Sequence, residues 1–243
     1  LALVICSLFL RDDQLWWYFA VPWLKGVIGA ARLVGGVQYR VHGADNLPPA
    51  HDMRRVILCP KHQSTWETFF LPSMTPHPLA YVFKKELLNI PVFGWCMARL
   101  KMIHIDRSKR SEAWNKVAEQ GRVLMDRGKW IIMFPEGTRT ERGARGDYKS
   151  GATRLAVATG ASVIPIAVTS GRCWPRRSFS FIPGVIDVSI GQAVSAEGRD
   201  ADELMDEVER WIEAEMHRLD PEAYPGAAAA GRTYDNEERG TPS

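Results

Sequence analysis

The chain has 243 residues, enough for one sizeable hydrophobic core, and its 46% hydrophobic and 24% charged residues are typical of globular proteins. This composition excludes a mainly disordered, collagen-like or coiled-coil chain. The formal net charge is only +3, but 26 Lys and Arg accompany 14 Asp and Glu in residues 1–196, whereas 5 accompany 14 in residues 197–243. A basic body with an acidic tail suits a partner that carries negative charge: phosphate, nucleic acid or an anionic membrane.

The first 37 residues are predicted to form a membrane anchor that partly spans the bilayer or lies in its interface. Residues 1–10 are apolar and uncharged, but a transmembrane helix needs about 20 residues. Residues 15–37 combine Trp and other aromatic side chains with Lys25 and Arg32, a composition that favours the membrane interface.

This anchor is expected to consist of separate pieces. The chain begins at Leu1 rather than Met, so we expect that preceding residues are missing. Residues 11–13, with one Arg and two Asp, are predicted to separate two apolar stretches. Pro22 and several glycines argue against one straight helix.

Residues 38–220 alternate between short apolar runs and longer amphipathic stretches, which predicts a single α/β domain with a mixed, largely parallel sheet flanked by helices. Residues 221–243, with Pro, Gly, an alanine run and acids, are predicted to form a disordered acidic tail. Predicted strands cover residues 38–42, 55–59, 79–83, 102–105, 130–134, 163–168 and 185–190. Predicted helices cover residues 66–74, 85–88, 111–127, 151–159 and 202–219.

Polar clusters follow three of the predicted strands, at the edge of the sheet where α/β proteins bind ligands. They are KHQSTWE at 61–67, DRSKR at 106–110 and PEGTR at 135–139. A carboxylate from Glu67 on one nitrogen of His62 would make the other nitrogen a general base that needs no protein nucleophile. Because Arg binds phosphate through two parallel hydrogen bonds, the residues alone predict an enzyme acting on a phosphate-bearing ligand near a membrane.

Four motifs occur in order along the chain: KHQSTWE (61–67), FKKELLNIPVFGW (83–95) with KMIHIDR (101–107), FPEGTR (134–139) and VIPIAV (163–168). In these motifs the sequence resembles the glycerophospholipid acyltransferase family, and most of all its bacterial 1-acylglycerol-3-phosphate acyltransferases. One departure is that Glu67 stands where the HxxxxD box of the family usually has Asp.

The resemblance implies transfer of a fatty acyl group from acyl-CoA or acyl-carrier protein to the 2-hydroxyl of 1-acylglycerol 3-phosphate, giving phosphatidate in phospholipid biosynthesis. His62 would take the hydroxyl proton, and Glu67 would orient His62. Pro165 would shape the acyl pocket or have a structural role. No metal and no cofactor is expected beyond the thioester co-substrate. The glycerol phosphate would be bound by Arg107, Glu136, Gly137, Thr138 and Arg139, with Lys101 as a further candidate.

The expected partners are the two substrates, a phospholipid membrane and, as an alternative donor, acyl carrier protein, with no nucleic acid. Free cysteines and a basic body suggest the inner membrane, with the catalytic domain on the cytoplasmic side. The basic side chains expected to face anionic headgroups or the donor are Arg142, Arg145, Lys149, Arg172, Arg176 and Arg177.

Three alternatives stay open at this point. The same fold and chemistry could serve another acceptor, either glycerol 3-phosphate or a different lysophospholipid. A thioesterase could use Ser64 or Cys59 as nucleophile, although neither lies in a known nucleophile motif. A basic membrane- or nucleic-acid-binding module would account for the charge but would leave the His62 and FPEGTR motifs unexplained.

Overall fold

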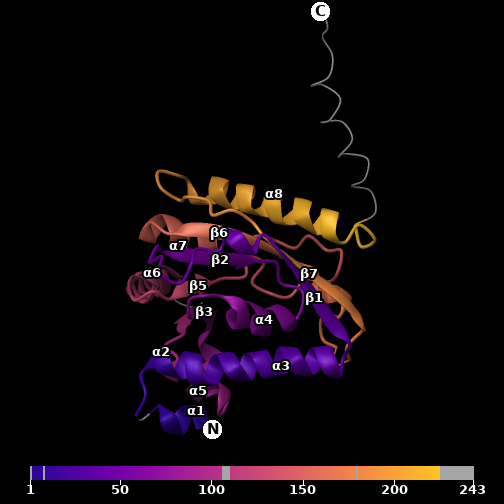
Figure 1. The fold of residues 1–243 in the computed structure, drawn as a ribbon. Coiled ribbons are helices and arrows are strands. Elements are labelled where there is room, and N and C mark those ends of the chain that lie inside the picture. Colours follow the sequence, from indigo (N-terminus) through magenta and orange to yellow (C-terminus); the bar gives the residue numbers. More distant parts are fainter. Residues whose placement is uncertain (1, 8, 106–109, 179, 225–243) are drawn as a thin grey trace, which may run out of the picture.

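The computed structural model describes residues 2–7, 9–105, 110–178 and 180–224, which form a seven-stranded sheet with helices on both faces (Figure 1). Each predicted strand is present, with ends that differ by one or two residues. The strands are β1 (Val37–His42), β2 (Val56–Pro60), β3 (Leu79–Lys84), β4 (Ile103–Ile105), β5 (Trp130–Ile132), β6 (Ser162–Val168) and β7 (Gly184–Ile190).

The strand order is β1-β7-β6-β2-β5-β3-β4, and every neighbouring pair is parallel except β6 and β7. The predicted mixed, largely parallel sheet is therefore confirmed. Strand β2 lies in the centre and every one of its residues is buried, because helices cover both faces. The carboxyl ends of β2, β5, β3 and β4 meet at one end of the sheet, where α/β proteins bind their ligands.

Three helices pack against one another and on one face of the sheet: α6 (Arg110–Asp126), α7 (Gly151–Thr159) and α8 (Ala201–Leu219). Helix α4 (Trp66–Met74) lies on the other face, with α3 (Val21–Leu33) packed outside it (Figure 1). Helices α4, α6, α7 and α8 agree with the predicted helices to within one residue at each end, whereas α3 lies in the segment predicted as a membrane anchor. Short 3₁₀ turns are η2 (Ala44–Asn46), η3 (Lys85–Asn89) and η4 (Ser170–Arg172).

Helix α5 (Phe93–Arg99) was not predicted. It spans only seven residues of an apolar stretch, which is too short for helical periodicity to be distinguished from a strand.

The N-terminal segment forms α1 (Ala2–Cys6), α2 (Asp12–Leu15), a π-helical turn η1 (Trp16–Ala20) and α3. Pro22 and the glycines were expected to prevent one straight helix, and a π-helical turn does interrupt the regular α-helix just before Pro22. The chain does not leave the helical conformation there, because the residues at the α2–η1 and η1–α3 junctions have helical dihedral angles from Asp12 to Leu33. A π turn directly before Pro22 shifts the hydrogen-bond register, which accommodates a residue without an N–H. The chain does break between α1 and α2, next to the predicted 11–13 separator.

Helix α3 joins the domain core through one face, since its buried residues recur at steps of three and four. Trp16 is also in the core at 2% exposure, so it does not belong with the interfacial aromatics, whereas Trp17, Tyr18 and Trp23 are exposed. Within the described residues, no helix is both long enough and apolar enough to cross a bilayer.

The predicted tail starts too early. Residues 221–224 form a turn, and Tyr224 is buried against His217, with ring centroids 4.5 Å apart. The remaining residues of the predicted tail, 225–243, lie outside the described part of the chain.

Candidate active site

The loop after β2 brings His62 and Glu67 together. Glu67 occupies the first turn of α4 and is fully buried, and its Oε1 lies 2.9 Å from Nδ1 of His62. The same oxygen accepts the backbone N–H groups of Gln63 at 2.8 Å and Ser64 at 2.7 Å. A carboxylate at this nitrogen favours the tautomer with the proton on Nδ1 and leaves Nε2 as the proton acceptor.

Helix α4, which carries Glu67, is anchored from its middle. Pro72 lies inside the helix and cannot donate to the carbonyl of Thr68. The hydroxyl of Tyr81 on β3 donates to that carbonyl instead, at 2.7 Å. The helix is thereby tied to the sheet at the residue directly after Glu67, which helps to hold the carboxylate in place.

The rest of the His62 side chain is held by the loop after β5. The imidazole stacks on Phe134, with ring centroids 3.8 Å apart and planes inclined by 19°. The His62 carbonyl accepts from both the N–H and the hydroxyl of Thr140, at 2.8 and 3.1 Å. The side chain is 13% exposed, and Nε2 has no hydrogen bond to any described residue. This nitrogen is therefore open to a substrate proton.

The turn after β5 carries Glu136, Gly137, Thr138 and Arg139. Gly137 has φ +66°, a left-handed conformation that favours glycine, and its N–H donates to Phe134 at 3.1 Å. Gly137 and Thr138 are exposed beside the His62 loop, and Arg139 is half-buried. Glu136 is buried, and one of its oxygens accepts the His62 N–H at 3.3 Å and lies 3.4 Å from Lys61 Nζ. Burial raises the pKa of Glu136 to about 7, and the Lys61 ammonium opposes that rise.

Comparison with known proteins identifies the family. The family model described as Acyltransferase matches residues 38–169, more than half of the chain. A 1-acyl-sn-glycerol-3-phosphate acyltransferase of Pseudomonas aeruginosa is 42% identical over 202 residues, covering 82% of this chain and 77% of that protein. This chain belongs to the acyltransferase family.

More distant relatives are also named 1-acyl-sn-glycerol-3-phosphate acyltransferase. Proteins of Limnanthes douglasii and, as the alpha form, Mus musculus are each 28% identical and match 71% and 72% of this acyltransferase. The chain spans 60% and 61% of their length. The crystal structure of the 1-acyl-sn-glycerophosphate acyltransferase from Thermotoga maritima has the same fold, with a TM-score of 0.72, 23% identity and coverage of 90% of this chain and 87% of that one.

Of the predicted site residues, Arg107 lies outside the described part of the chain, and Lys101 lies away from His62. Lys101 precedes β4 and lies 3.3 Å from Asp12, which also pairs with Lys129 before β5 at 2.8 Å. Strands β2, β5, β3 and β4 are all parallel, and Lys101 and Lys129 precede their strands whereas His62 follows β2. This cluster therefore lies at the end of the sheet opposite to the His62 loop. The structure thus places Lys101 in contact with the N-terminal helix and away from the His62 loop.

Pro165 lies within β6 and is paired with Cys59 of β2. Its ring is close to Gly191 and the Trp211 side chain of α8, since a Cβ on Gly191 would meet both. This position under α8 supports the structural role rather than the acyl-pocket role.

The alternative protein nucleophiles are poorly placed. Cys59 is fully buried, and burial raises the pKa of its thiol far above the usual range. Ser64 is 1% exposed, and its hydroxyl oxygen accepts the N–H of Trp66 at 2.8 Å. In the part of the chain that the structure describes, no three His, Cys, Asp or Glu side chains gather as metal ligands would.

Several basic side chains expected to face anionic ligands are paired with acids near the C-terminus. Arg142 donates twice to Asp220, at 2.8 and 2.7 Å, and Arg172 donates to the same carboxylate at 2.8 Å. Arg145 pairs with Glu209 of α8 at 2.6 Å. The charge asymmetry along the sequence is therefore partly neutralised in the fold.

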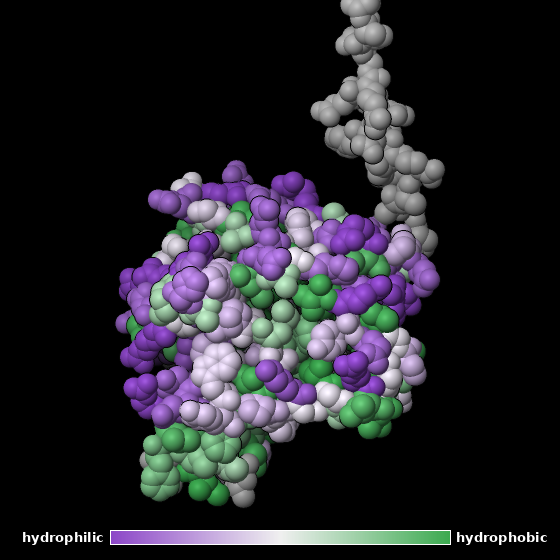
Figure 2. Space-filling view, viewed as in Figure 1, coloured by the Kyte–Doolittle hydropathy of each residue, from purple (hydrophilic) through white to green (hydrophobic). Residues whose placement is uncertain are grey.

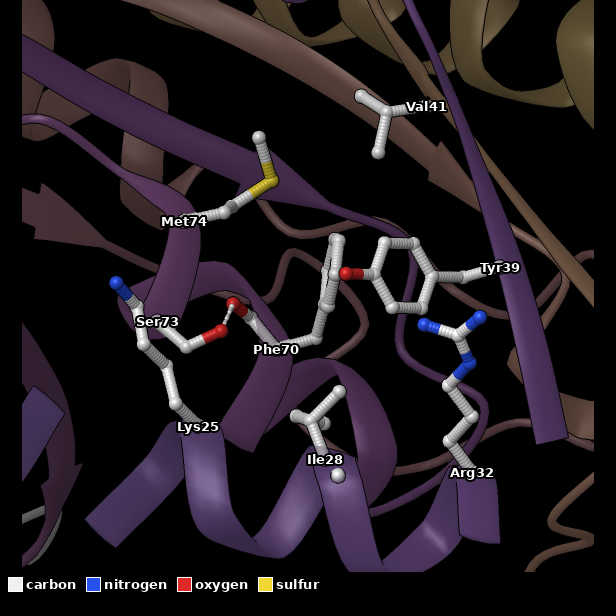
Figure 3. A pocket seen from close by; sticks show the side chains of 9 residues that line it. Lys25, Ile28, Arg32, Tyr39, Val41, Phe70, Ser73 and Met74 are labelled. Atoms are coloured by element: carbon white, nitrogen blue, oxygen red, sulfur yellow. Dashed lines mark hydrogen bonds between the residues drawn. The ribbon is translucent and has the colours of Figure 1, made fainter. Parts of the chain in front are cut away.

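A pocket of about 290 Å³ lies between α3, α4 and β1 (Figure 3). Apolar and aromatic side chains form most of its wall, and Lys25 and Arg32 stand on either side of Ile28 along α3 (Figure 3). Phe70 of its wall follows Glu67 by one turn of α4, so the pocket begins close to the helix that carries the carboxylate. Its remaining lining residues are Gly29, Tyr39, Val41, Ser73 and Met74.

Proposed function

We propose that this acyltransferase transfers a fatty acyl group from a thioester to the 2-hydroxyl of 1-acyl-sn-glycerol 3-phosphate. The observation that carries the proposal is the His62–Glu67 pair, in which one nitrogen is held by a buried carboxylate and the other is open. A base without a protein nucleophile suits direct attack by a substrate hydroxyl. The similar proteins of Pseudomonas aeruginosa, Limnanthes douglasii and Mus musculus are named for 1-acyl-sn-glycerol 3-phosphate, which supports this acceptor.

In this mechanism Nε2 of His62 takes the proton as the hydroxyl oxygen attacks the thioester carbonyl. Glu67 stabilises the imidazolium that forms. The tetrahedral intermediate collapses as the C–S bond breaks, and the imidazolium returns its proton to the leaving thiolate, which restores the base. Arg107, Gly137, Thr138 and Arg139 are proposed to bind the glycerol phosphate.

The test is transfer of a labelled acyl group from acyl-CoA to lysophosphatidate in detergent micelles, with phosphatidate as the measured product. Parallel assays replace the acceptor by glycerol 3-phosphate or other lysophospholipids and the donor by acyl-carrier protein. Formation of phosphatidate at a higher kcat/KM than any other product is expected. Folded protein that acylates only a different acceptor would overturn the assignment of the acceptor but retain the chemistry.

We further propose that the pocket between α3 and α4 holds a fatty chain. The pocket is mostly apolar, it neighbours the Glu67 helix, and two cations stand on α3 beside it. An extended hydrocarbon with an anionic head is the substrate feature that fits such a lining.

Replacing Gly29 by leucine tests this placement. Gly29 lines the pocket and has no atom within 4 Å of an added Cβ, so the larger side chain enters the cavity without disturbing α3. We expect kcat/KM for substrates with long chains to fall about tenfold, while short-chain substrates are little affected. Gly26→Leu is the matched control, because Gly26 is in the same helix, is equally unobstructed and does not line the pocket. Equal losses in the two variants would contradict the placement.

We also propose that the protein binds the inner membrane, with its catalytic domain on the cytoplasmic side. Exposed apolar side chains gather at the end of the molecule where α1 lies (Figure 2), and α1 packs against α5. Residues 87–98, which include most of α5, contain no charged residue, and Ile90, Phe93 and Trp95 are each about half exposed. Aromatic and aliphatic side chains in this setting suit the interface of a bilayer.

The double variant Phe93→Glu/Trp95→Glu is expected to lower binding to anionic phospholipid vesicles at least about tenfold, because each ring loses its transfer out of water. Flotation with vesicles measures the bound fraction. Val157→Glu on α7 is the control, since Val157 is similarly exposed on a different face of the domain. Unchanged flotation of the double variant would show that α5 does not contact the membrane.

A further inference from the structure

A fully buried lysine directly precedes the candidate base. The Lys61 ammonium donates to Glu213 of α8 at 2.6 Å and to the backbone carbonyl of Arg145. The hydroxyl of Tyr148 donates to the same Glu213 oxygen at 2.7 Å. A buried ammonium persists only where it is paired and hydrogen-bonded, so this cluster joins α8 firmly to the loop after β5.

The Lys61 ammonium also contacts Glu136, a residue of the loop after β5 that binds the backbone of His62. Lys61 Nζ is 3.4 Å from Glu136 Oε1, the oxygen that accepts the backbone N–H of His62. The Lys61 side chain reaches α8, whereas the His62 side chain reaches Phe134 and α4. The Lys61 ammonium thus lies between the carboxylates of Glu136 and Glu213, next to the loop after β2 that carries His62.

The charge on Glu136 depends on everything packed around it. Burial favours the neutral form of Glu136, whereas the Lys61 ammonium favours its ionised form. Glu213 binds the same ammonium more closely, at 2.6 Å against 3.4 Å for Glu136, and so competes for that cation. The titratable groups that face or interact with Glu136 are Lys61, His62, Glu213, Tyr148, Cys59 and Tyr224.

We propose that Lys61 and Glu213 are a positioning pair for the His62 loop. Lys61 keeps Glu136 charged, so that this carboxylate holds the His62 N–H, and Glu213 limits that effect by sharing the ammonium. Neither residue touches the reacting atoms. The inference rests on the proposed function for its activity measurement.

The two members of the pair predict opposite effects. Lys61→Met removes the cation but retains the length of the side chain, so Glu136 ionises at higher pH. Glu213→Gln removes the competing carboxylate and leaves Glu136 as the carboxylate paired with Lys61, so Glu136 ionises at lower pH. A purely structural role would lower activity or stability in both variants without moving the pH dependence in opposite directions.

The experiment measures kcat/KM against pH for lysophosphatidate acylation in wild type, Lys61→Met, Glu213→Gln and the double variant. We expect the acid limb to move by about one pH unit upward in Lys61→Met and by a similar amount downward in Glu213→Gln. The double variant is expected to lie between them. Glu209→Gln is the control, because Glu209 lies one turn from Glu213 and pairs with the exposed Arg145 on the same loop. Solvent screens that pair, so its loss should leave the limb unmoved.

A second measurement needs no substrate. The ¹³C carboxyl signal of Glu136, assigned by its absence from Glu136→Gln, is followed by NMR titration in the same variants. Titration midpoints that move in the two predicted directions support the pair even if lysophosphatidate is not acylated, in which case only the proposed function fails. Midpoints and limbs that stay in place, or move together in both variants, overturn the inference. If Lys61→Met does not fold, the downward shift in Glu213→Gln decides the question alone.

Discussion

His62→Ala is expected to lower kcat for acyl transfer by roughly 10²- to 10⁴-fold, the usual contribution of a general base. Among the described residues, the alternative nucleophiles Ser64 and Cys59 are buried and are not placed to replace the open Nε2 of His62. KM for both substrates should change much less, because the ring accepts a proton and does not supply the binding energy. Steady-state kinetics in detergent micelles measures both parameters.

The control for this variant is His51→Ala, which removes an exposed imidazole from the turn between β1 and β2. It should retain wild-type kinetics. A His62→Ala protein that is folded and still transfers acyl groups at more than about a tenth of the wild-type rate would show that His62 is not the base.

Glu67→Gln is expected to lower kcat by about 10²-fold or more, because the amide cannot stabilise the imidazolium as a carboxylate does. The Glu67 Oε1 atom accepts from His62 and from two backbone N–H groups, so the substitution also weakens the loop around the base. The matched variant is Glu67→Asp, which has the residue usual in the family. It retracts the carboxylate by about 1.5 Å, so that the 2.9 Å contact opens unless the loop moves.

We expect kcat of Glu67→Asp to lie between the values for wild type and Glu67→Gln, about tenfold below wild type. Its kcat should change with pH in the same direction as that of wild type. Full activity of Glu67→Asp would mean that the loop follows the shorter side chain. Full activity of Glu67→Gln would contradict the role of the carboxylate altogether. Both are measured as kcat against pH in the assay used for His62→Ala.

The pairing of His62 with Glu67 was predictable because it depends on local geometry. A polar cluster directly after an apolar strand, followed by a helix, places two side chains five residues apart around one turn. The buried apolar runs of β2 and β5 likewise predicted the centre of a largely parallel sheet.

The position of Lys61 was not predictable in this way. In the sequence it is one more cation in a basic body, and a lysine is rarely fully buried. Its partner Glu213 lies 152 residues further along the chain, on a helix whose amphipathic pattern does not reveal which strand it covers. The only available signal was its place beside the His62 motif at the end of a buried strand.

The positions of Lys101 and Trp16 likewise depend on packing that the local sequence does not reveal. Lys101 belongs to a motif similar to the family's second box, yet the packing of the N-terminal helix pairs it with Asp12. Trp16 and Trp17 are neighbours of the same type, and only the packed domain decides that the first is buried and the second exposed.

Periodicity, turn residues and short spacings act over a few residues, so they were enough to predict the seven strands, the longer helices of the domain and the His62–Glu67 pair. Packing in three dimensions was needed to show which charges are buried, which are neutralised by distant partners and which aromatic residues face outward. Those properties arise from the packing of elements far apart in the chain, where desolvation and pairing outweigh local preference.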